Sequence, residues 1–186
     1  MKTAVFGAGS WGTVFAKVLA DAGGDVTLWG RRRDVVDAIN ATRRNPDYLP
    51  DCTLPERLRA TTDVAEAAGG ASYVILAVPA QTLRANLSEW RPLIDADAVL
   101  VSLMKGIELG TCKRMSEVIA EVAEVPAERV AVVSGPNLAR EIVLEQPSAA
   151  VVACADEPTA QKLQLACMTP YFRAYTNTDV VGCELG

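Results

Sequence analysis

The chain has 186 residues, half of them hydrophobic, and a net charge of −5. This composition excludes a disordered chain and indicates a packed core, with a length of one domain or of one domain and the start of a second. The acidic balance argues against nucleic acid as a partner, because phosphate backbones require a basic face, although a local basic cluster could still bind an anion.

Short β-branched runs alternate with longer helical patterns along the chain. The expected strands are 3–6, 26–29, 73–78, 99–103, 130–134, 149–153 and 172–175. The expected helices are 11–22, 33–40, 81–90, 111–122 and 159–167. Segment 45–56 contains three prolines and is expected to be a structured loop. Several strands are continuously apolar, so this alternation predicts an α/β fold with a mainly parallel sheet covered by helices on both faces.

The first strand leads into a Gly-x-Gly-x-x-Gly motif that opens a helix, with glycines Gly7, Gly9 and Gly12. In a dinucleotide-binding βαβ unit the first glycine permits the turn, the second admits the pyrophosphate and the third lets helix and strand pack closely. The motif predicts a doubly wound fold of the Rossmann type. Ser10 and Trp11 lie where the chain would touch the ligand, although Trp11 could instead serve helix packing.

The second strand ends in a run of arginines about twenty residues after the glycine motif. An acidic residue there would bind a 2′-hydroxyl and indicate NAD, whereas arginine suits the 2′-phosphate of NADP. We therefore expect Arg31 and Arg32 to bind the adenosine side of NADP(H), with Arg33 solvated. NAD(H) remains possible because a guanidinium can stack on adenine, and the run could also be only a solvated helix start.

Three later strands end in residues that would also reach the carboxyl edge of the sheet. Pro79 follows the third expected strand and is either a site element or a simple turn. Lys105, followed by glycine, could bind a phosphate as a point charge or be solvated. Within Ser134-Gly135-Pro136-Asn137, Asn137 could donate to a substrate oxygen or cap the following helix.

The five cysteines are scattered, odd in number and without a Cys-x-x-Cys pair, so we expect reduced thiols and neither a disulfide framework nor a metal site. Histidine is absent, which excludes histidine acid–base catalysis, Ser–His triads and histidine metal ligation within the chain. Met1 runs directly into the first strand, and no apolar run is long enough to span a bilayer. We expect a soluble cytoplasmic protein without membrane insertion.

The ordered set of motifs resembles the bacterial NAD(P)-dependent glycerol-3-phosphate dehydrogenases over the whole chain. The motifs are GAGSWGT from Gly7, LWGR from Leu28, Asn45 with YLP from Tyr48, KGIE from Lys105, SGPN from Ser134, and Gly182 with the terminal Leu185-Gly186. The resemblance implies reduction of dihydroxyacetone phosphate to sn-glycerol 3-phosphate for glycerophospholipid synthesis.

The resemblance also assigns roles to individual residues. It implies that NADPH contacts Ser10, Trp11, Arg31, Arg32, Tyr48, Lys105 and Ala139, and that substrate contacts Lys105, Gly135 and Asn137. Position 137 is more often Ser or Thr in the family, which leaves the contact of this asparagine open. The family's proton-transferring lysine falls just beyond Gly186, so no catalytic acid or base is expected among these residues.

The last residues predict the start of another helix, with an N-cap signature at Thr178-Asp179. We expect a cofactor domain over 1–178, and residues 179–186 as the start of the helical substrate domain of a longer enzyme. Two alternatives are a two-domain dehydrogenase of another hydroxy acid or sugar acid, and a non-catalytic dinucleotide-binding module. The sequence leaves open whether the full-length enzyme is a homodimer.

Overall fold

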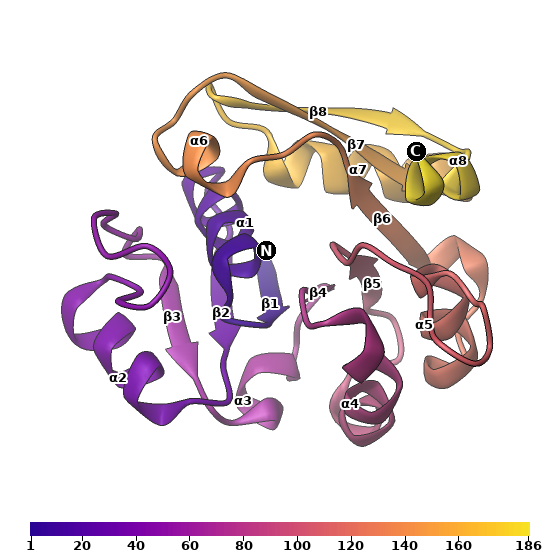
Figure 1. Cartoon of the computed structure of the whole chain (residues 1–186), viewed down its shortest axis with the longest axis horizontal. Helices are drawn as coiled ribbons and strands as arrows, with labels where there is room; N and C mark the ends of the chain where they lie inside the picture. The colour runs from indigo at the N-terminus through magenta and orange to yellow at the C-terminus, as the bar shows by residue number, and fades with distance from the viewer.

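The computed structural model describes all residues, 1–186, and contains eight strands and eight α-helices (Figure 1). The strands are β1 (Lys2–Phe6), β2 (Asp25–Trp29), β3 (Leu58–Thr61), β4 (Tyr73–Leu76), β5 (Val99–Ser102), β6 (Val130–Ser134), β7 (Ser148–Cys154) and β8 (Phe172–Asn177). The helices are α1 (Ser10–Asp21), α2 (Arg33–Thr42), α3 (Val64–Ala68), α4 (Leu83–Trp90), α5 (Met115–Ala123), α6 (Ala139–Val143), α7 (Glu157–Cys167) and α8 (Val180–Leu185). Three single turns of 3₁₀ helix are η1 (Ala80–Thr82), η2 (Arg91–Leu93) and η3 (Ala127–Arg129).

All eight strands form one sheet in the order β3-β2-β1-β4-β5-β6-β7-β8. Every neighbouring pair is parallel except β6 and β7. The first six strands have the order 3-2-1-4-5-6 of a Rossmann fold, which confirms the expected fold class. The antiparallel pair has a local consequence: Ser134 lies opposite Val151, so the chain after β6 and the chain before β7 meet at the same edge.

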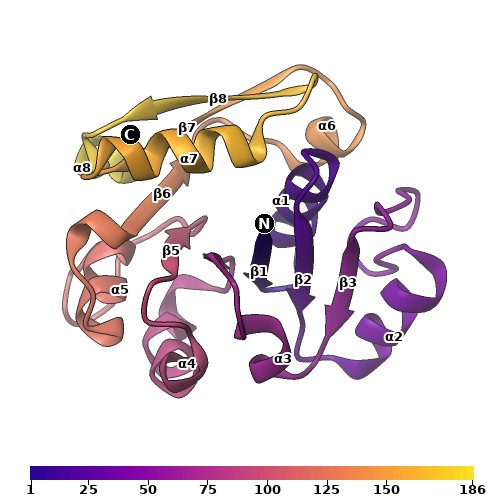
Figure 2. The ribbon, with the colours of Figure 1, turned by 180° about the vertical axis from the view of Figure 1, so that it is seen from behind.

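The sheet separates two hydrophobic cores, as expected for strands that are buried on both faces. Val5 belongs to the core packed against α1, α2, α6 and α7, whereas its neighbours Ala4 and Phe6 belong to the core packed against α3, α4 and α5. This alternation follows from the period of two along a strand. Figures 1 and 2 show α7 lying along β7 and β8, which it contacts.

Two elements, β3 and α3, lie outside the sequence expectation. Two helices begin later than expected: α4 at Leu83, after the 3₁₀ turn η1, and α5 at Met115. The helix expected over 111–122 begins at Met115, because the preceding segment turns through Cys112 at φ 58° and pairs Ile107 with Arg114 in an isolated bridge. The Glu117 carboxylate accepts a hydrogen bond from the Arg114 backbone N–H at 2.9 Å, which fixes this start.

The expected C-terminal helix start is confirmed as α8, capped by the Asp179 side chain, which accepts from the Gly182 N–H at 2.8 Å. Helix α8 packs against β6 and β7. Its Glu184 carboxylate is almost buried and accepts from Arg114 Nη1 at 2.6 Å and from the Ser116 N–H at 2.9 Å. This carboxylate therefore joins α8 to the first turn of α5, where a negative charge is favoured.

None of these helices has both the length and the apolar character that a membrane span requires.

Candidate functional site

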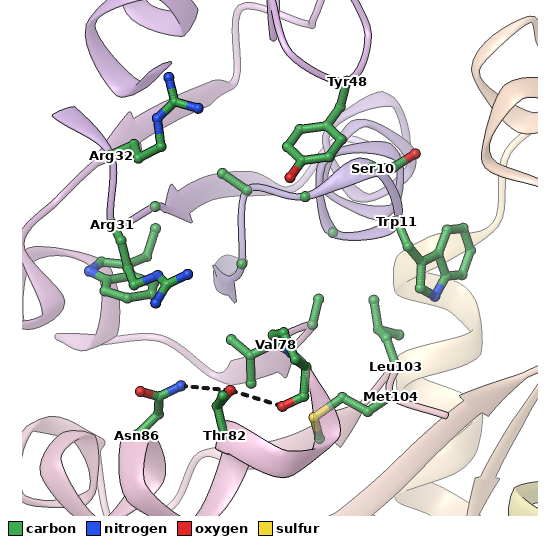
Figure 3. Close-up of a pocket in the computed structure, with 18 of the residues that line it drawn as sticks. Ser10, Trp11, Arg31, Arg32, Tyr48, Val78, Thr82, Asn86, Leu103 and Met104 are labelled. Atoms are coloured by element: carbon green, nitrogen blue, oxygen red, sulfur yellow. Dashed lines mark hydrogen bonds between the residues drawn. The ribbon is translucent and has the colours of Figure 1, made fainter. Parts of the chain in front are cut away.

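A pocket of about 520 Å³, the main pocket, lies at the carboxyl edge of the sheet above β1, β2 and β4. Strand β1 lies between the other two, which is the point where the strand order reverses and where open α/β folds bind ligands. Nine of the expected cofactor-binding residues line this pocket: Gly7, Gly9, Ser10, Trp11, Gly12, Arg31, Arg32, Tyr48 and Lys105. Figure 3 shows Arg31 and Arg32 on one side of the pocket and Trp11 on the opposite side.

The three motif glycines have different physical reasons for being glycine. A Cβ on Gly7, whose φ is 127°, would lie 2.3 Å from the Ala77 carbonyl oxygen, and a Cβ on Gly12 would lie 2.0 Å from the Gly7 carbonyl oxygen. A Cβ on Gly9 would meet nothing within 4 Å. Gly9 also has φ −79° and ψ −176°, which any residue adopts. Packing therefore requires Gly7 and Gly12 to be glycine, whereas nothing within the chain explains Gly9.

Helix α1 begins at the pocket without a side-chain cap. Gly9 occupies the N-cap position and provides no side chain to accept from the first N–H groups. The exposed N–H groups and the positive end of the helix dipole favour an anion at this position. Trp11 packs its ring on Phe15, with the ring centroids 5.7 Å apart, and it also lines the pocket, so its contact with a ligand stays a prediction.

The two arginines after β2 differ in their environment. Arg31 forms no ion pair, whereas Arg32 pairs with Asp34 and with Asp47. Figure 3 shows the two side chains diverging, with Arg31 directed toward the pocket. Arg33 lies outside the pocket lining, and its Nη2 donates to Thr62 Oγ1 at 3.1 Å.

The loop before Leu49 reaches back to the glycine motif through a buried asparagine. Asn45 Nδ2 donates to the Ala8 carbonyl oxygen at 3.0 Å and to Thr13 Oγ1 at 2.9 Å. Its Oδ1 accepts from the Asp47 N–H at 3.3 Å. These bonds hold Asp47 and Tyr48 on the pocket wall.

The loop that carries Lys105 is fastened to α4 and η1. Gln81 binds it twice: its Nε2 donates to the Ile107 carbonyl oxygen and its Oε1 accepts from the Leu109 N–H, both at 2.9 Å. Arg84 forms a bidentate pair with Glu108 through two contacts of 2.9 Å. The Lys105 Nζ lies 3.5 Å from the Gly135 carbonyl oxygen. Lys105 thus connects the main pocket with the chain after β6.

The ion pairs around this loop predict sensitivity to acid. The Arg84 guanidinium, and then the Thr111 hydroxyl, lower the pKa of Glu108, and Arg84 with Lys113 lowers the pKa of Glu121 to about 2. A carboxyl whose pKa is depressed by folding stabilises the fold above its ordinary pKa, near 4.5, and loses that contribution as pH falls through the folded value.

We therefore expect the free energy of unfolding to fall between about pH 5 and pH 2, and to fall less in Arg84→Met. Urea unfolding at a series of pH values measures this difference. The matched control is Arg43→Met, which removes an exposed arginine paired with Glu56 elsewhere. An acid dependence that is the same in parent and Arg84→Met would contradict the assignment.

A second cavity, of about 320 Å³, lies beside the antiparallel pair β6 and β7 and includes Gly135 and Asn137. Asn137 does not cap α6, since the N-cap is Leu138 and no side chain caps that helix. Its buried Oδ1 has no hydrogen-bond partner. The capping alternative is therefore wrong, and Asn137, which lines the cavity, retains a buried acceptor without a partner. Ala139 lines neither pocket and packs against the core.

Comparisons with known proteins agree with this geometry. Residues 2–160 match the family model described as "NAD-dependent glycerol-3-phosphate dehydrogenase N-terminus". The chain belongs to this family. A glycerol-3-phosphate dehydrogenase [NAD(P)+] from Streptomyces avermitilis is 69% identical over all 186 residues, and one from Thermobifida fusca is 64% identical. The chain spans 55% of the length of each of these relatives.

The same family appears among solved structures. The crystal structure of glycerol-3-phosphate dehydrogenase from Coxiella burnetii superposes with a TM-score of 0.91 at 36% identity. The match covers 99% of this chain and 56% of that one.

Several pocket residues of this family member were not indicated by its sequence patterns. Asp47, Thr82 and Asn86 line the main pocket. Asn86 Nδ2 donates to Thr82 Oγ1 at 3.2 Å, and that hydroxyl donates to the Pro79 carbonyl oxygen at 2.9 Å (Figure 3). The only sequence feature that indicates Thr82 is its position three residues after Pro79, the proline that follows β4, and this feature is weak.

Proposed function

We propose that this chain is the cofactor-binding part of an NAD(P)-dependent glycerol-3-phosphate dehydrogenase. The proposed reaction is reduction of dihydroxyacetone phosphate to sn-glycerol 3-phosphate, which supplies glycerophospholipid synthesis. The observation that carries the proposal is Gly9, whose Cβ position is open space in a pocket at the uncapped start of α1. A pyrophosphate needs that space and those N–H groups, so the residues fit the cofactor.

The proposed cofactor site extends across the main pocket from Trp11 to the two arginines. The backbone at Gly9, Ser10 and Trp11 binds the pyrophosphate, and Arg31 and Arg32 bind the 2′-phosphate of NADP(H), the preferred cofactor, with NAD(H) also accepted. Tyr48 provides an aromatic ring on the wall between them. When bound, the dihydronicotinamide supplies the hydride, while the chain orients it and excludes water.

The proposed substrate site lies between the two pockets. Lys105 contacts both cofactor and substrate, since it lines the main pocket and lies 3.5 Å from the Gly135 carbonyl oxygen. Gly135 and Asn137 form part of the wall of the substrate site. Ala139 packs against the hydrophobic core and supports residues 135–137 from that side. We also propose that Ala139 contacts the cofactor in the longer enzyme. Asp47 is the one carboxylate that lines the main pocket, and it is paired with Arg32 at the arginine end.

We propose that the proton required by the new alkoxide comes from a lysine beyond residue 186. We also propose that residues 1–178 form the cofactor domain, that 179–186 begin the helical substrate domain, and that the full-length enzyme is a cytoplasmic homodimer.

The first test is the cofactor preference of Arg31→Ala. Arg31 is the pocket arginine without an ion pair, and one charge-assisted contact to a phosphate contributes about 1.5–3 kcal/mol, or roughly ten- to over a hundredfold in affinity. We expect the parent to bind NADPH more tightly than NADH, and Arg31→Ala to lose most of this difference. Calorimetric titration of both nucleotides measures it, and Arg33→Ala is the matched control. Equal affinities of the parent, unchanged in Arg31→Ala, would contradict the 2′-phosphate assignment.

A further inference from the structure

Arg32 is already occupied by two carboxylates of the chain. Its Nε and Nη2 face the two oxygens of Asp34 at 3.2 and 2.5 Å, and its Nη1 donates to Asp47 Oδ2 at 2.5 Å. All three side chains are accessible to solvent, with 61% of Arg32 and 35% of Asp47 exposed. Exposed pairs of this kind contribute little to stability, so the fold does not explain why both carboxylates lie there.

Asp47 differs from Asp34 because it lies on the pocket wall. It is among the residues that line the main pocket, together with Arg31 and Arg32, whereas Asp34 is not. Its backbone N–H is held by Asn45, which is fully buried and bound to Ala8 in the glycine loop. The same anchored loop therefore fixes a carboxylate at the arginine end of the pocket.

We infer that Asp47 determines the balance between NADH and NADPH in this site, an inference that rests on the proposed nicotinamide-dinucleotide function. Its carboxylate holds the Arg32 guanidinium and places a negative charge where the adenosine ribose binds. A 2′-phosphate has to share Arg32 with Asp47 and is repelled by its charge. A 2′-hydroxyl instead finds an acceptor in that carboxylate, as in NAD-specific sites.

This arrangement combines both kinds of recognition within one pocket. Arg31, which has no carboxylate partner, favours the 2′-phosphate, and Asp47 opposes it and favours the 2′-hydroxyl. Asp47 offsets part of the effect of Arg31, so the site prefers NADPH and also accepts NADH. Removing the charge of Asp47 leaves Arg31 and the Nη1 group of Arg32 to bind the phosphate, while Asp34 still binds Nε and Nη2.

The experiment compares cofactor affinities of parent, Asp47→Asn and Asp51→Asn by calorimetric titration with NADPH and NADH. Asp51 lies in the same loop, is exposed and forms no ion pair, and it does not line the pocket. We expect Asp47→Asn to tighten NADPH by roughly three- to tenfold and to leave NADH unchanged or weaker. Asp51→Asn should keep the parent ratio, although both variants make the same change in net charge.

Two smaller nucleotides test whether the effect of Asp47 acts at the 2′ position of the ribose. Adenosine 2′,5′-bisphosphate should gain affinity in Asp47→Asn by the same factor as NADPH, and adenosine 5′-monophosphate should not. An unchanged NADPH-to-NADH ratio in Asp47→Asn, or an equal shift in Asp51→Asn, overturns the inference while cofactor binding by the parent still supports the proposed function. A folded parent that binds neither nucleotide overturns the proposed function itself.

Discussion

Gly9→Val should abolish cofactor binding while leaving the chain folded. The branched side chain would fill the open space above the start of α1, where no atom of the chain lies within 4 Å of the Cβ position. Excluding the pyrophosphate removes at least two charge-assisted bonds to backbone N–H groups, about 3–6 kcal/mol in total, so affinity should fall more than a hundredfold. The backbone at Gly9 suits valine, and the stability cost should be about 1 kcal/mol, that of a poor N-cap residue.

The matched comparison is Gly12→Val, five residues after Gly7 in the same motif. Its Cβ would lie 2.0 Å from the Gly7 carbonyl oxygen and 3.0 Å from the Ala77 Cβ, so the contact between α1 and the sheet would have to open. We expect that variant to lose about 3 kcal/mol or more, as other severe overpacking does. Urea unfolding and NADPH titration of both variants separate the two effects. If Gly9→Val binds NADPH as tightly as the parent does, the glycine motif is a structural turn and does not bind the pyrophosphate.

The regular part of the fold could be predicted because each buried element carries its own local signal. Strand β4 is apolar throughout and β6 is apolar as far as Ser134, since both faces are covered by helices. The short strand β3 (Leu58–Thr61) lies at the sheet edge with Arg59 exposed, and it carries no such signal. Helix α3 has five residues, too few for a helical period to be seen.

The candidate site could be predicted in part, because the positions of its residues relative to the strands can be seen in the sequence. In a parallel sheet the residues after each strand meet at one edge, so Gly7, Arg31 and Lys105 could be brought together from their positions alone. Their partners could not, because Asp47 lies 15 residues from Arg32 and Glu108 lies 24 residues from Arg84. Residues so far apart in the sequence come into contact only when packing places the loops that carry them.

The largest expected effect concerns turnover. We expect the 186-residue chain to bind NADPH without reducing dihydroxyacetone phosphate, and a chimera that continues it with the remaining length of the Streptomyces avermitilis relative to be active. Reduction requires a hydride, a proton donor for the alkoxide and an anchor for the phosphate. The chain has no histidine, and Asp47, the single carboxylate that lines the main pocket, is paired with Arg32 at the arginine end. Lack of a general acid typically costs about 10²–10⁴ in rate, and lack of substrate positioning costs more.

Within the chimera, Lys105→Ala should lower kcat/KM by about 10²-fold or more, because Lys105 joins the main pocket to Gly135. The assay follows NADPH oxidation at 340 nm, a wavelength at which reduced nicotinamide absorbs, with Lys162→Ala on the exposed face of α7 as the matched control. Robust turnover by the 186-residue chain would place the proton donor inside it. Full activity of Lys105→Ala in the chimera would remove Lys105 from the site, whereas loss of activity in Lys162→Ala as well would indicate damage to the fold.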